Sequence, residues 1–279
     1  MVGVIGGTRF IGRFLIDALV DSGESVMWLI RDPARASGLV SKDVELVRFD
    51  LEQILEHLSE LDCVISAAPI RMAERVLEVC RVGGIRRAVF LSSAWRYSLY
   101  ATEQVEAVIR GETLVMDSDL VWAILRPAMI NGPGDRNVSV IREQILQRSV
   151  LPVIGSGEPL GQLVHVEDIA FAISATLPRE GTHRTCYDLG GPEAMTCSQM
   201  IDEIASCVGK HPLKLYVPMF VAATVAWVME KFVRDTKVTR DRVRRMREDR
   251  HLDVQEATNQ QAYYPRDFTD GLRDSGIRR

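Results

Sequence analysis

The sequence lacks the cysteine and charge patterns of several protein classes. Its five cysteines are scattered and none forms a C-x-x-C pair, so we expect reduced thiols and no metal site. Basic residues are not in excess, since the net charge is −4 and the pI about 5.8. Proteins that bind nucleic acids present a basic surface, and we therefore expect no nucleic-acid partner.

The sequence also lacks a hydrophobic run long enough to cross a membrane. Its longest run, Leu215–Met229, has 15 residues and includes Pro218, whereas a spanning helix needs about 20 residues. We expect a buried helix there, followed by an exposed helix in the arginine-rich segment Arg240–Arg250. The alternative is a helix that lies on a membrane surface or lines an apolar pocket. The first residues have no basic region before an apolar run, so we expect no signal peptide and a cytoplasmic location.

Short apolar runs alternate with helical patterns over the first 130 residues. The runs are continuously apolar rather than alternating, which is typical of a parallel sheet covered by helices on both faces. We therefore predict an α/β fold with a Rossmann-like, doubly wound parallel sheet. The predicted strands are residues 2–5, 26–30, 44–49, 64–68, 88–91 and 120–125, and helices are predicted from Phe10, Ala73 and about Thr102.

Glycine- and proline-rich loops become frequent after residue 130. We predict a dinucleotide-binding core at residues 1–130, to which 166–190 returns, and a small C-terminal α/β substrate lobe at 131–165 and 191–279. Within these later segments, Asp168 is expected to open a helix that runs to Leu177. Thr196 and Gln199 have the spacing of a capping box for a helix that ends near Gly209.

A glycine-rich turn stands between the first strand and the first helix. Gly6 allows a tight turn, and Gly12 allows the helix to approach the strand closely. The amides at the start of such a helix, together with its dipole, favour a pyrophosphate. The turn therefore predicts dinucleotide binding by Gly6, Thr8, Arg9, Phe10 and Ile11.

Two arginines bear on which dinucleotide is bound. Arg9 replaces a glycine common in such turns, and Arg31 ends the second strand, where NAD-specific sites place an acidic residue about 20 residues past the turn. A guanidinium matches a 2′-phosphate with two hydrogen bonds. We therefore expect NADP(H), with NAD(H) as the alternative because Asp32 is adjacent to Arg31.

Further motifs follow the later strands. Together with the glycine turn, they resemble the extended or atypical short-chain dehydrogenase/reductases, including the NAD-dependent epimerase/dehydratase, NmrA-like and complex-I-accessory-subunit-like branches. The resemblance covers nearly the whole chain. The motifs are Asp50-Leu51, Ser66-Ala67-Ala68-Pro69, Ser92-Ser93-Ala94, Arg126-Pro127 and His165-Val166-Glu167-Asp168.

The resemblance implies roles for the matching positions. It implies that Ser93 is a catalytic serine that binds a substrate oxygen, with Tyr97 or Tyr100 beside it in the active site. The implied contacts to the adenine are Asp50 and Leu51, and those to the ribose and nicotinamide are Ala67, Ala68, Pro69, Ser92, Pro127 and Met129.

The sequence departs from this family in lacking its tyrosine–lysine pair. In the family a lysine four residues after the tyrosine lowers the tyrosine's pKa. Only five lysines are present, and none lies between residues 43 and 209. Alignment on Glu112 puts Gln104 and Val108 at the two positions. Tyr97 or Tyr100 remains the candidate acid/base, and Arg96 or Arg110 the candidate cation.

Two functions therefore stay open. The first is an enzyme, an NAD(P)(H)-dependent oxidoreductase or an epimerase/dehydratase-like protein, with a small-molecule substrate for which a nucleotide sugar is the guess that the resemblance suggests. The second is a non-catalytic NADP(H)-binding sensor or scaffold, which the missing dyad favours. We expect a monomer or a homodimer without a transmembrane segment, and peripheral membrane contact is the further alternative.

Overall fold

The computed structural model describes residues 1–30, 32, 44–48, 55–177, 184–233, 239–261 and 263–276. Three of the residues predicted to contact the cofactor, Arg31, Asp50 and Leu51, lie outside these ranges.

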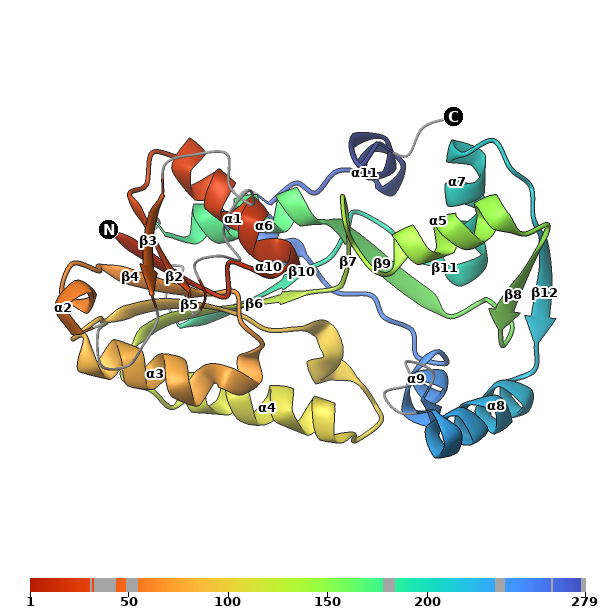
Figure 1. Cartoon of the computed structure of the whole chain (residues 1–279), viewed down its shortest axis with the longest axis horizontal. Coiled ribbons are helices and arrows are strands. Elements are labelled where there is room, and N and C mark those ends of the chain that lie inside the picture. Colours follow the sequence, from red (N-terminus) through yellow and green to blue (C-terminus); the bar gives the residue numbers. More distant parts are fainter. Residues whose placement is uncertain are drawn as a thin grey trace.

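Seven parallel strands form the main sheet, in the order β3-β2-β1-β4-β5-β6-β10 (Figure 1). The chain adds β2 and β3 on one side of β1 and then returns to add β4 on the other. This reversal is the switch point of a Rossmann sheet, so the predicted doubly wound fold is confirmed. The strands are β1 (Val2–Ile5), β2 (Val26–Ile30), β3 (Glu45–Arg48), β4 (Cys63–Ser66), β5 (Arg87–Leu91), β6 (Val121–Pro127) and β10 (Thr185–Leu189).

Helices cover both faces of this sheet because its strands carry apolar side chains on both sides. On one face α1 (Phe10–Asp21) and α6 (Val166–Thr176) pack against each other, and Trp28 and Tyr187 lie in the core beneath them. On the other face α2 (Leu55–Leu58), α3 (Ala73–Val82) and α4 (Glu103–Met116) enclose a second core that contains Phe90. Removing these aromatic and aliphatic side chains from water stabilises the sheet.

The C-terminal lobe has its own small sheets and core. Two short sheets, β11-β9-β7 and β12-β8, support the helices around a third apolar cluster that includes Ile145 and Ile204. Thr196 and Gln199 form the predicted capping box at the start of α7. The elements are β7 (Met129–Asn131), α5 (Val138–Gln147), β8 (Val150–Ile154), β9 (Leu160–His165), β11 (Ala194–Thr196), α7 (Cys197–Cys207), β12 (Leu213–Val217) and α11 (Phe268–Asp274).

The expected role of Asp168 as a helix opener is wrong. Helix α6 begins at Val166 with His165 at its N-cap, because β9 leads directly into the helix. Asp168 lies in the first turn, where its carboxylate accepts hydrogen bonds from the backbone and the guanidinium of Arg266 at 3.0 and 2.9 Å. It therefore anchors the segment before α11 to the Rossmann half.

The expectation of a buried helix over Leu215–Met229 is also wrong. Pro218 divides the run into the end of β12 and helix α8 (Met219–Phe232), and only Ala222 and Ala226 of α8 are buried. The arginine-rich segment forms a shorter helix than expected, α9 (Arg240–Arg245). None of the helices in the described ranges is long and apolar enough to cross a membrane.

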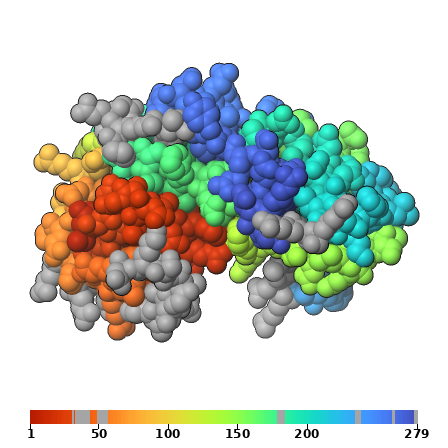
Figure 2. Space-filling model, turned by 90° about the horizontal axis from the view of Figure 1, so that it is seen from above, coloured from red at the N-terminus to blue at the C-terminus, as the bar shows by residue number. Residues whose placement is uncertain are grey.

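The C-terminal segment returns to the Rossmann half. Helix α10 (Gln255–Gln261) packs against β10, and Ala257 and Tyr263 belong to the core beneath α1 and α6. Figure 2 shows the Rossmann half, red to orange, separated from the green and cyan lobe by a notch, with the blue C-terminal segment bridging the two. The domain boundaries remain a prediction, but this segment of 191–279 packs with the Rossmann core.

Candidate functional site

The predicted site residues gather at the carboxyl edge of the sheet. Gly6 follows β1, Ala67 follows β4 and Ser92 follows β5, while Pro127 ends β6. Because parallel strands point in one direction, these segments meet along one edge. Met129 begins β7 just beyond it, at the passage into the C-terminal lobe. Ligands of open α/β sheets bind at this edge, beside the switch point.

The glycine turn has the geometry of a dinucleotide cradle. Gly6 has φ +85°, and a Cβ there would lie 2.6 Å from the backbone nitrogen of Ala68. A Cβ on Gly12 would lie 2.3 Å from Cα of Gly7, so only glycine lets α1 pack this closely. No side chain caps the first turn of α1, since the N-cap residue Arg9 makes no capping hydrogen bond. The turn therefore fits a pyrophosphate held by helix amides.

The other predicted cofactor contacts surround this cradle. Thr8 and Arg9 are exposed and Phe10 is half-buried, while Ile11 belongs to the core. The amide of Ala67 donates to the carbonyl of Ile5 at 2.8 Å, which fixes the segment 67–69 beside the glycine turn. The expected adenine contacts, Asp50 and Leu51, and the expected 2′-phosphate contact, Arg31, are outside the described residues.

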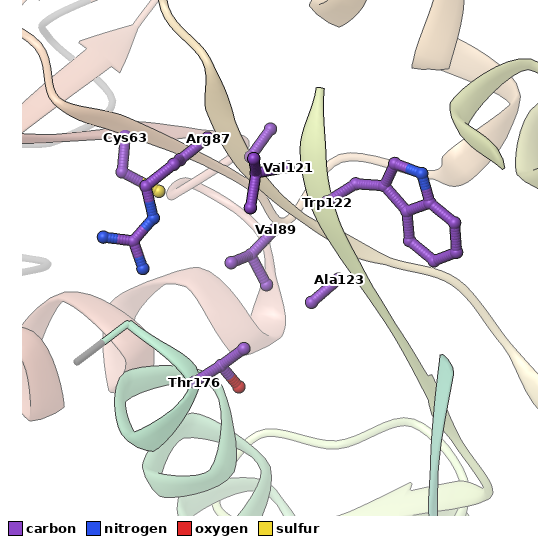
Figure 3. A pocket seen from close by; sticks show the side chains of 8 residues that line it. Cys63, Arg87, Val89, Val121, Trp122, Ala123 and Thr176 are labelled. Carbon is purple, nitrogen blue, oxygen red and sulfur yellow. The ribbon is translucent and has the colours of Figure 1, made fainter. Parts of the chain in front are cut away.

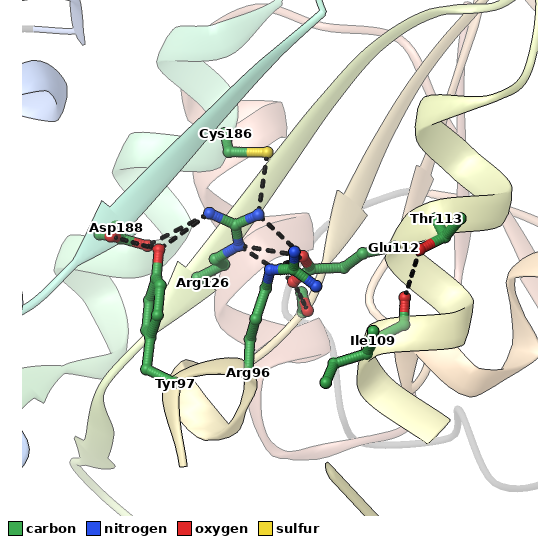
Figure 4. Close-up of polar contacts among 9 residues, drawn as sticks. Arg96, Tyr97, Ile109, Glu112, Thr113, Arg126, Cys186 and Asp188 are labelled. Atoms are coloured by element: carbon green, nitrogen blue, oxygen red, sulfur yellow. Dashed lines mark hydrogen bonds and ion pairs between the residues drawn. The ribbon is translucent and has the colours of Figure 1, made fainter. Parts of the chain in front are cut away.

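Three residues predicted to be catalytic follow β5 on or next to a short 3-10 helix, η3 (Ala94–Tyr97). Ser93 is its N-cap, and its hydroxyl accepts a hydrogen bond from the amide of Trp95 at 3.3 Å. Tyr97 points away from α4 toward β10 (Figure 4). Tyr100 lies farther along, with the guanidinium of Arg244 stacked 4.9 Å from the centre of its ring.

The hydroxyl of Tyr97 lies between the carboxylate of Asp188 and the guanidinium of Arg126. It donates to the Asp188 carboxylate at 2.8 Å and accepts from Nη1 of Arg126 at 2.9 Å. Burial and the hydrogen bond to Asp188 raise the pKa of Tyr97 to about 12, although Arg126 acts in the opposite direction. Burial also raises the pKa of Asp188. Tyr97 is therefore a neutral phenol at physiological pH.

Beneath Tyr97 lies the buried carboxylate of Glu112, on helix α4. It forms an ion pair with Arg126 at 2.7 Å and another with Arg96 at 3.1 Å, and it accepts a hydrogen bond from Ser92 at 2.5 Å (Figure 4). Burial alone would lower the pKa of Arg126, but the Glu112 carboxylate outweighs it and the pKa is raised. Glu112 thus orients the arginine that contacts Tyr97.

The two described positions that align with the family's tyrosine–lysine pair do not hold an equivalent pair. Gln104 is exposed on α4, and Val108 packs against the second core. Of the two candidate cations, Arg110 pairs with Glu106 on the surface of α4, and Arg96 pairs with Glu112. The cation that contacts Tyr97 is Arg126.

Sequence reasoning missed Arg126 and Asp188 as partners of Tyr97. Both stand in segments noted as motifs, Arg126-Pro127 and Tyr187-Asp188-Leu189, and both are polar residues in otherwise apolar strands. They become neighbours because β6 and β10 pair in parallel, with Arg126 opposite Asp188. A charged residue near the carboxyl end of a buried strand was the signal that could have identified them.

Two cavities lie at the opposite edge of the sheet. One, of about 10 Å³, is lined by residues such as Cys63, Val121 and Thr176 (Figure 3), and it has room for about one water molecule. A larger, open one of about 580 Å³ lies nearby, around Met1 and Asp62. Among the residues described, no cluster of three His, Cys, Asp or Glu side chains could hold a metal ion.

Comparison with known proteins gives a matching family model and several relatives. A family model described as NAD(P)H-binding matches residues 6–150. The mitochondrial NADH dehydrogenase (ubiquinone) 1 alpha subcomplex subunit 9 of Arabidopsis thaliana is 26% identical over 247 residues, which cover 80% of this chain and 61% of that subunit. A (4-alkanoyl-5-oxo-2,5-dihydrofuran-3-yl)methyl phosphate reductase of Streptomyces griseus is 27% identical over 233 residues, covering 77% of this chain and 76% of the reductase. The chain thus spans about three fifths of the plant subunit's length.

Solved structures share the fold at low sequence identity. The UDP-glucuronic acid 4-epimerase of Bacillus cereus, in complex with NAD, superposes with a TM-score of 0.77 at 17% identity. The match covers 98% of this chain and 96% of the epimerase.

Proposed function

Because the chain belongs to the NAD(P)H-binding family, as its resemblance to the extended short-chain dehydrogenase/reductases predicted, we propose that it is a reductase that uses NAD(P)H to reduce a small-molecule acceptor. The acceptor binds between the carboxyl edge of the sheet and the C-terminal lobe. When bound, the reduced nicotinamide supplies a hydride. The chain's own residues bind the acceptor, orient it and provide the proton.

The state of Tyr97 carries this proposal. A phenol with a pKa near 12 is almost entirely protonated at pH 7, so it holds a proton for the acceptor, although it is a weaker acid than an ordinary tyrosine. Reduction of the acceptor requires a proton donor for its oxygen. Epimerase-type chemistry begins by removing a proton from a substrate hydroxyl, and for that a phenol of this pKa is poorly suited. The protonated Tyr97, with Arg126 beside its oxygen, therefore fits a proton donor better than a base.

The neighbours of Tyr97 fit the role of proton donor. When Tyr97 gives its proton to the acceptor oxygen, Arg126 at 2.9 Å stabilises the phenolate that remains. Ser93 stands at the start of the same short helix, and its hydroxyl proton is available to the acceptor oxygen because its own oxygen is an acceptor from Trp95. Tyr100 is the less suitable candidate, since its ring stacks on Arg244.

We propose NADPH rather than NADH as the donor. Arg9 is exposed at the N-cap of α1, where a guanidinium can meet a 2′-phosphate. Arg31, the second arginine of this argument, stands outside the described residues. Acceptors worth testing are small carbonyls, quinones and nucleotide sugars.

A non-catalytic cofactor holder is the second candidate. The observation in its favour is that Ser93 and Tyr97 both have partners within the protein: Trp95 for the serine, Asp188 and Arg126 for the tyrosine. Such contacts can also serve as purely structural ones. The two candidates differ in turnover but not in cofactor binding.

The experiment measures binding first and turnover second. Calorimetric titration with NADP+, NADPH, NAD+ and NADH is followed by an assay of nicotinamide absorbance with each class of acceptor. Gly6→Ala should weaken cofactor binding about tenfold or more, because its Cβ meets Ala68. Gly23→Ala is the matched control, since Gly23 also has φ +85° but has no atom within 4 Å of its Cβ.

The outcomes separate the alternatives. A reductase binds NADPH and oxidises it with at least one acceptor, and Ser93→Ala slows that turnover while leaving cofactor affinity nearly unchanged. Tight binding without turnover over the whole panel identifies the cofactor holder. Absence of binding to all four dinucleotides contradicts both proposals.

A further inference from the structure

Helix α8 is oriented opposite to an ordinary surface helix. Its inward face carries small side chains, and Ala222 and Ala226 pack with Val243 of α9 in a minor core. Large apolar side chains stand on the other side. Surface helices of water-soluble domains place their bulky apolar residues inward and polar residues outward.

The outward apolar side chains lie along the length of the helix and form what we term the α8 face. Phe220 and Phe232, near its two ends, are 73% and 75% exposed. The polar residues Thr224 and Lys231 stand among these side chains, and Lys231 lies 5.5 Å from the ring centre of Trp227. Exposed apolar patches of this kind mark interaction sites. The members of the α8 face are Phe220, Val221, Val225, Trp227, Val228 and Phe232.

The sequence from the end of helix α8 onward is rich in basic residues. Residues 231–250 contain nine Lys and Arg against four Asp and Glu, so the segment carries +5 while the rest of the chain carries −9. Within it, Arg242, Arg244 and Arg247 are exposed. Helices α8 and α9 contact each other and lie together beyond the end of the main sheet, at the lower right of Figure 1. The α8 face and these three arginines, which we term the basic cluster, thus occupy one region of the molecule.

We propose that the α8 face and the exposed arginines 242, 244 and 247 bind the surface of a bilayer that contains anionic lipids. A helix of 14 residues is about 21 Å long, too short to span the hydrocarbon core but suited to lying in the interface. Aromatic and aliphatic side chains then enter the acyl boundary while the basic groups meet lipid phosphates. The Rossmann half, with the proposed reductase site, stays in the aqueous phase.

Charge decides against the other occupants of the α8 face. A second copy of the chain bound through the same face would bring two basic clusters into one interface, where like charges repel. An apolar substrate alone would require an enclosed pocket, whereas the two phenylalanines are about three quarters exposed. An anionic bilayer complements both the α8 face and the basic cluster.

Co-sedimentation with vesicles tests the proposal on the full chain. Vesicles of phosphatidylcholine with phosphatidylglycerol should bind the protein, pure phosphatidylcholine vesicles should bind it much less, and high salt should release it. The double variant Phe220→Ser, Phe232→Ser should reduce the bound fraction about tenfold. Tyr264→Ser is the apolar control, because Tyr264 is 78% exposed but is not part of the α8 face.

A matched pair of charge-reversal variants tests the contribution of positive charge to vesicle binding. Arg247→Glu should weaken binding to the anionic vesicles, while Arg75→Glu, an equal charge change on the exposed side of α3, should have a smaller effect. Brominated lipids provide a direct contact readout. They should quench tryptophan fluorescence of the wild type, and Trp227→Phe should remove most of that quenching.

The results that overturn the proposal are specific. Wild-type protein that stays in the supernatant with anionic vesicles contradicts it, as does unchanged binding by a folded Phe220→Ser, Phe232→Ser variant. Dimerisation in sedimentation velocity that this variant abolishes would assign the α8 face to a second copy instead. Neither result depends on turnover, so the reductase proposal stands or fails separately.

Discussion

At the residue scale, the neighbours of Tyr97 determine its protonation state. A lysine close to a tyrosine would lower its pKa, but burial and a strand carboxylate raise the pKa of Tyr97. The cation in contact, Arg126, shares the buried Glu112 carboxylate with Arg96. The net result is a tyrosine biased toward keeping its proton.

This bias predicts a titration. Because the folded-state pKa of Tyr97 lies above the ordinary value of about 10, its contribution to stability is complete below pH 10 and is lost as the pH rises through about 12. Absorbance titration of tyrosinate up to pH 11 should therefore give nearly the same curve for the wild type and Tyr97→Phe. Asp188→Asn should add the ionisation of one tyrosine at lower pH, since the carboxylate that raises the pKa is gone. If the wild type ionised one tyrosine more than Tyr97→Phe, with a midpoint near pH 10, this assignment would be contradicted.

At the scale of elements, Glu112 connects helix α4 to strand β6, to the loop after β5 and to η3. Its side chain is fully buried and meets two guanidiniums and a hydroxyl from those three segments. A single carboxylate therefore fixes the position of α4 relative to the edge of the sheet where the proposed reaction occurs.

Glu112→Gln should lower the free energy of unfolding by about 3–5 kcal/mol, because it leaves buried Arg126 without its anionic partner. Glu106→Gln on the same helix removes a carboxylate from an exposed pair with Arg110, and its effect should stay below about 1 kcal/mol. Urea unfolding followed by circular dichroism measures both. Equal effects of the two substitutions would mean that the buried network does not stabilise the fold.

Elements were also where sequence reasoning succeeded and failed most clearly. The spacing of apolar residues was sufficient for the strands, for α3 over residues 73–82 and for the capping box at Thr196, since these depend on local periodicity and local hydrogen bonds. It could not show that α8 turns its bulky residues outward, because hydropathy does not say which side of a helix meets the protein. Nor could it join Asp188 to Tyr97, which depends on the pairing of β6 with β10.

At the scale of the whole molecule, the C-terminal segment holds the two halves together. Arg266 forms ion pairs with Glu167 and Asp168 of α6 and with Asp274 of α11. The hydroxyl of Tyr263 donates to the carbonyl of Gly190 at 2.7 Å, within the Rossmann core. The lobe and the sheet thus share one cooperative packing unit.

Two neighbouring tyrosines allow a direct test of this packing. Tyr263 is 1% exposed, and Tyr263→Ala should cost about 3–5 kcal/mol of unfolding free energy through lost burial and a cavity. Tyr264→Ala, at a side chain that is 78% exposed, should change it by less than about 0.5 kcal/mol. Thermal unfolding should lower the transition of both halves in Tyr263→Ala. A separate, unchanged transition for the Rossmann half would show that it is independent of the C-terminal segment.

The return of Tyr263 to the first core also sets an order of events during synthesis. Strand β1 leaves the ribosome long before residue 263, so the core that already contains Trp28 and Tyr187 lacks the buried ring of Tyr263 until then. Nascent chains shorter than this expose apolar surface on the α1 and α6 side, and such surfaces are what chaperones bind. We therefore expect the Rossmann half to complete its packing only after residue 263 has been translated.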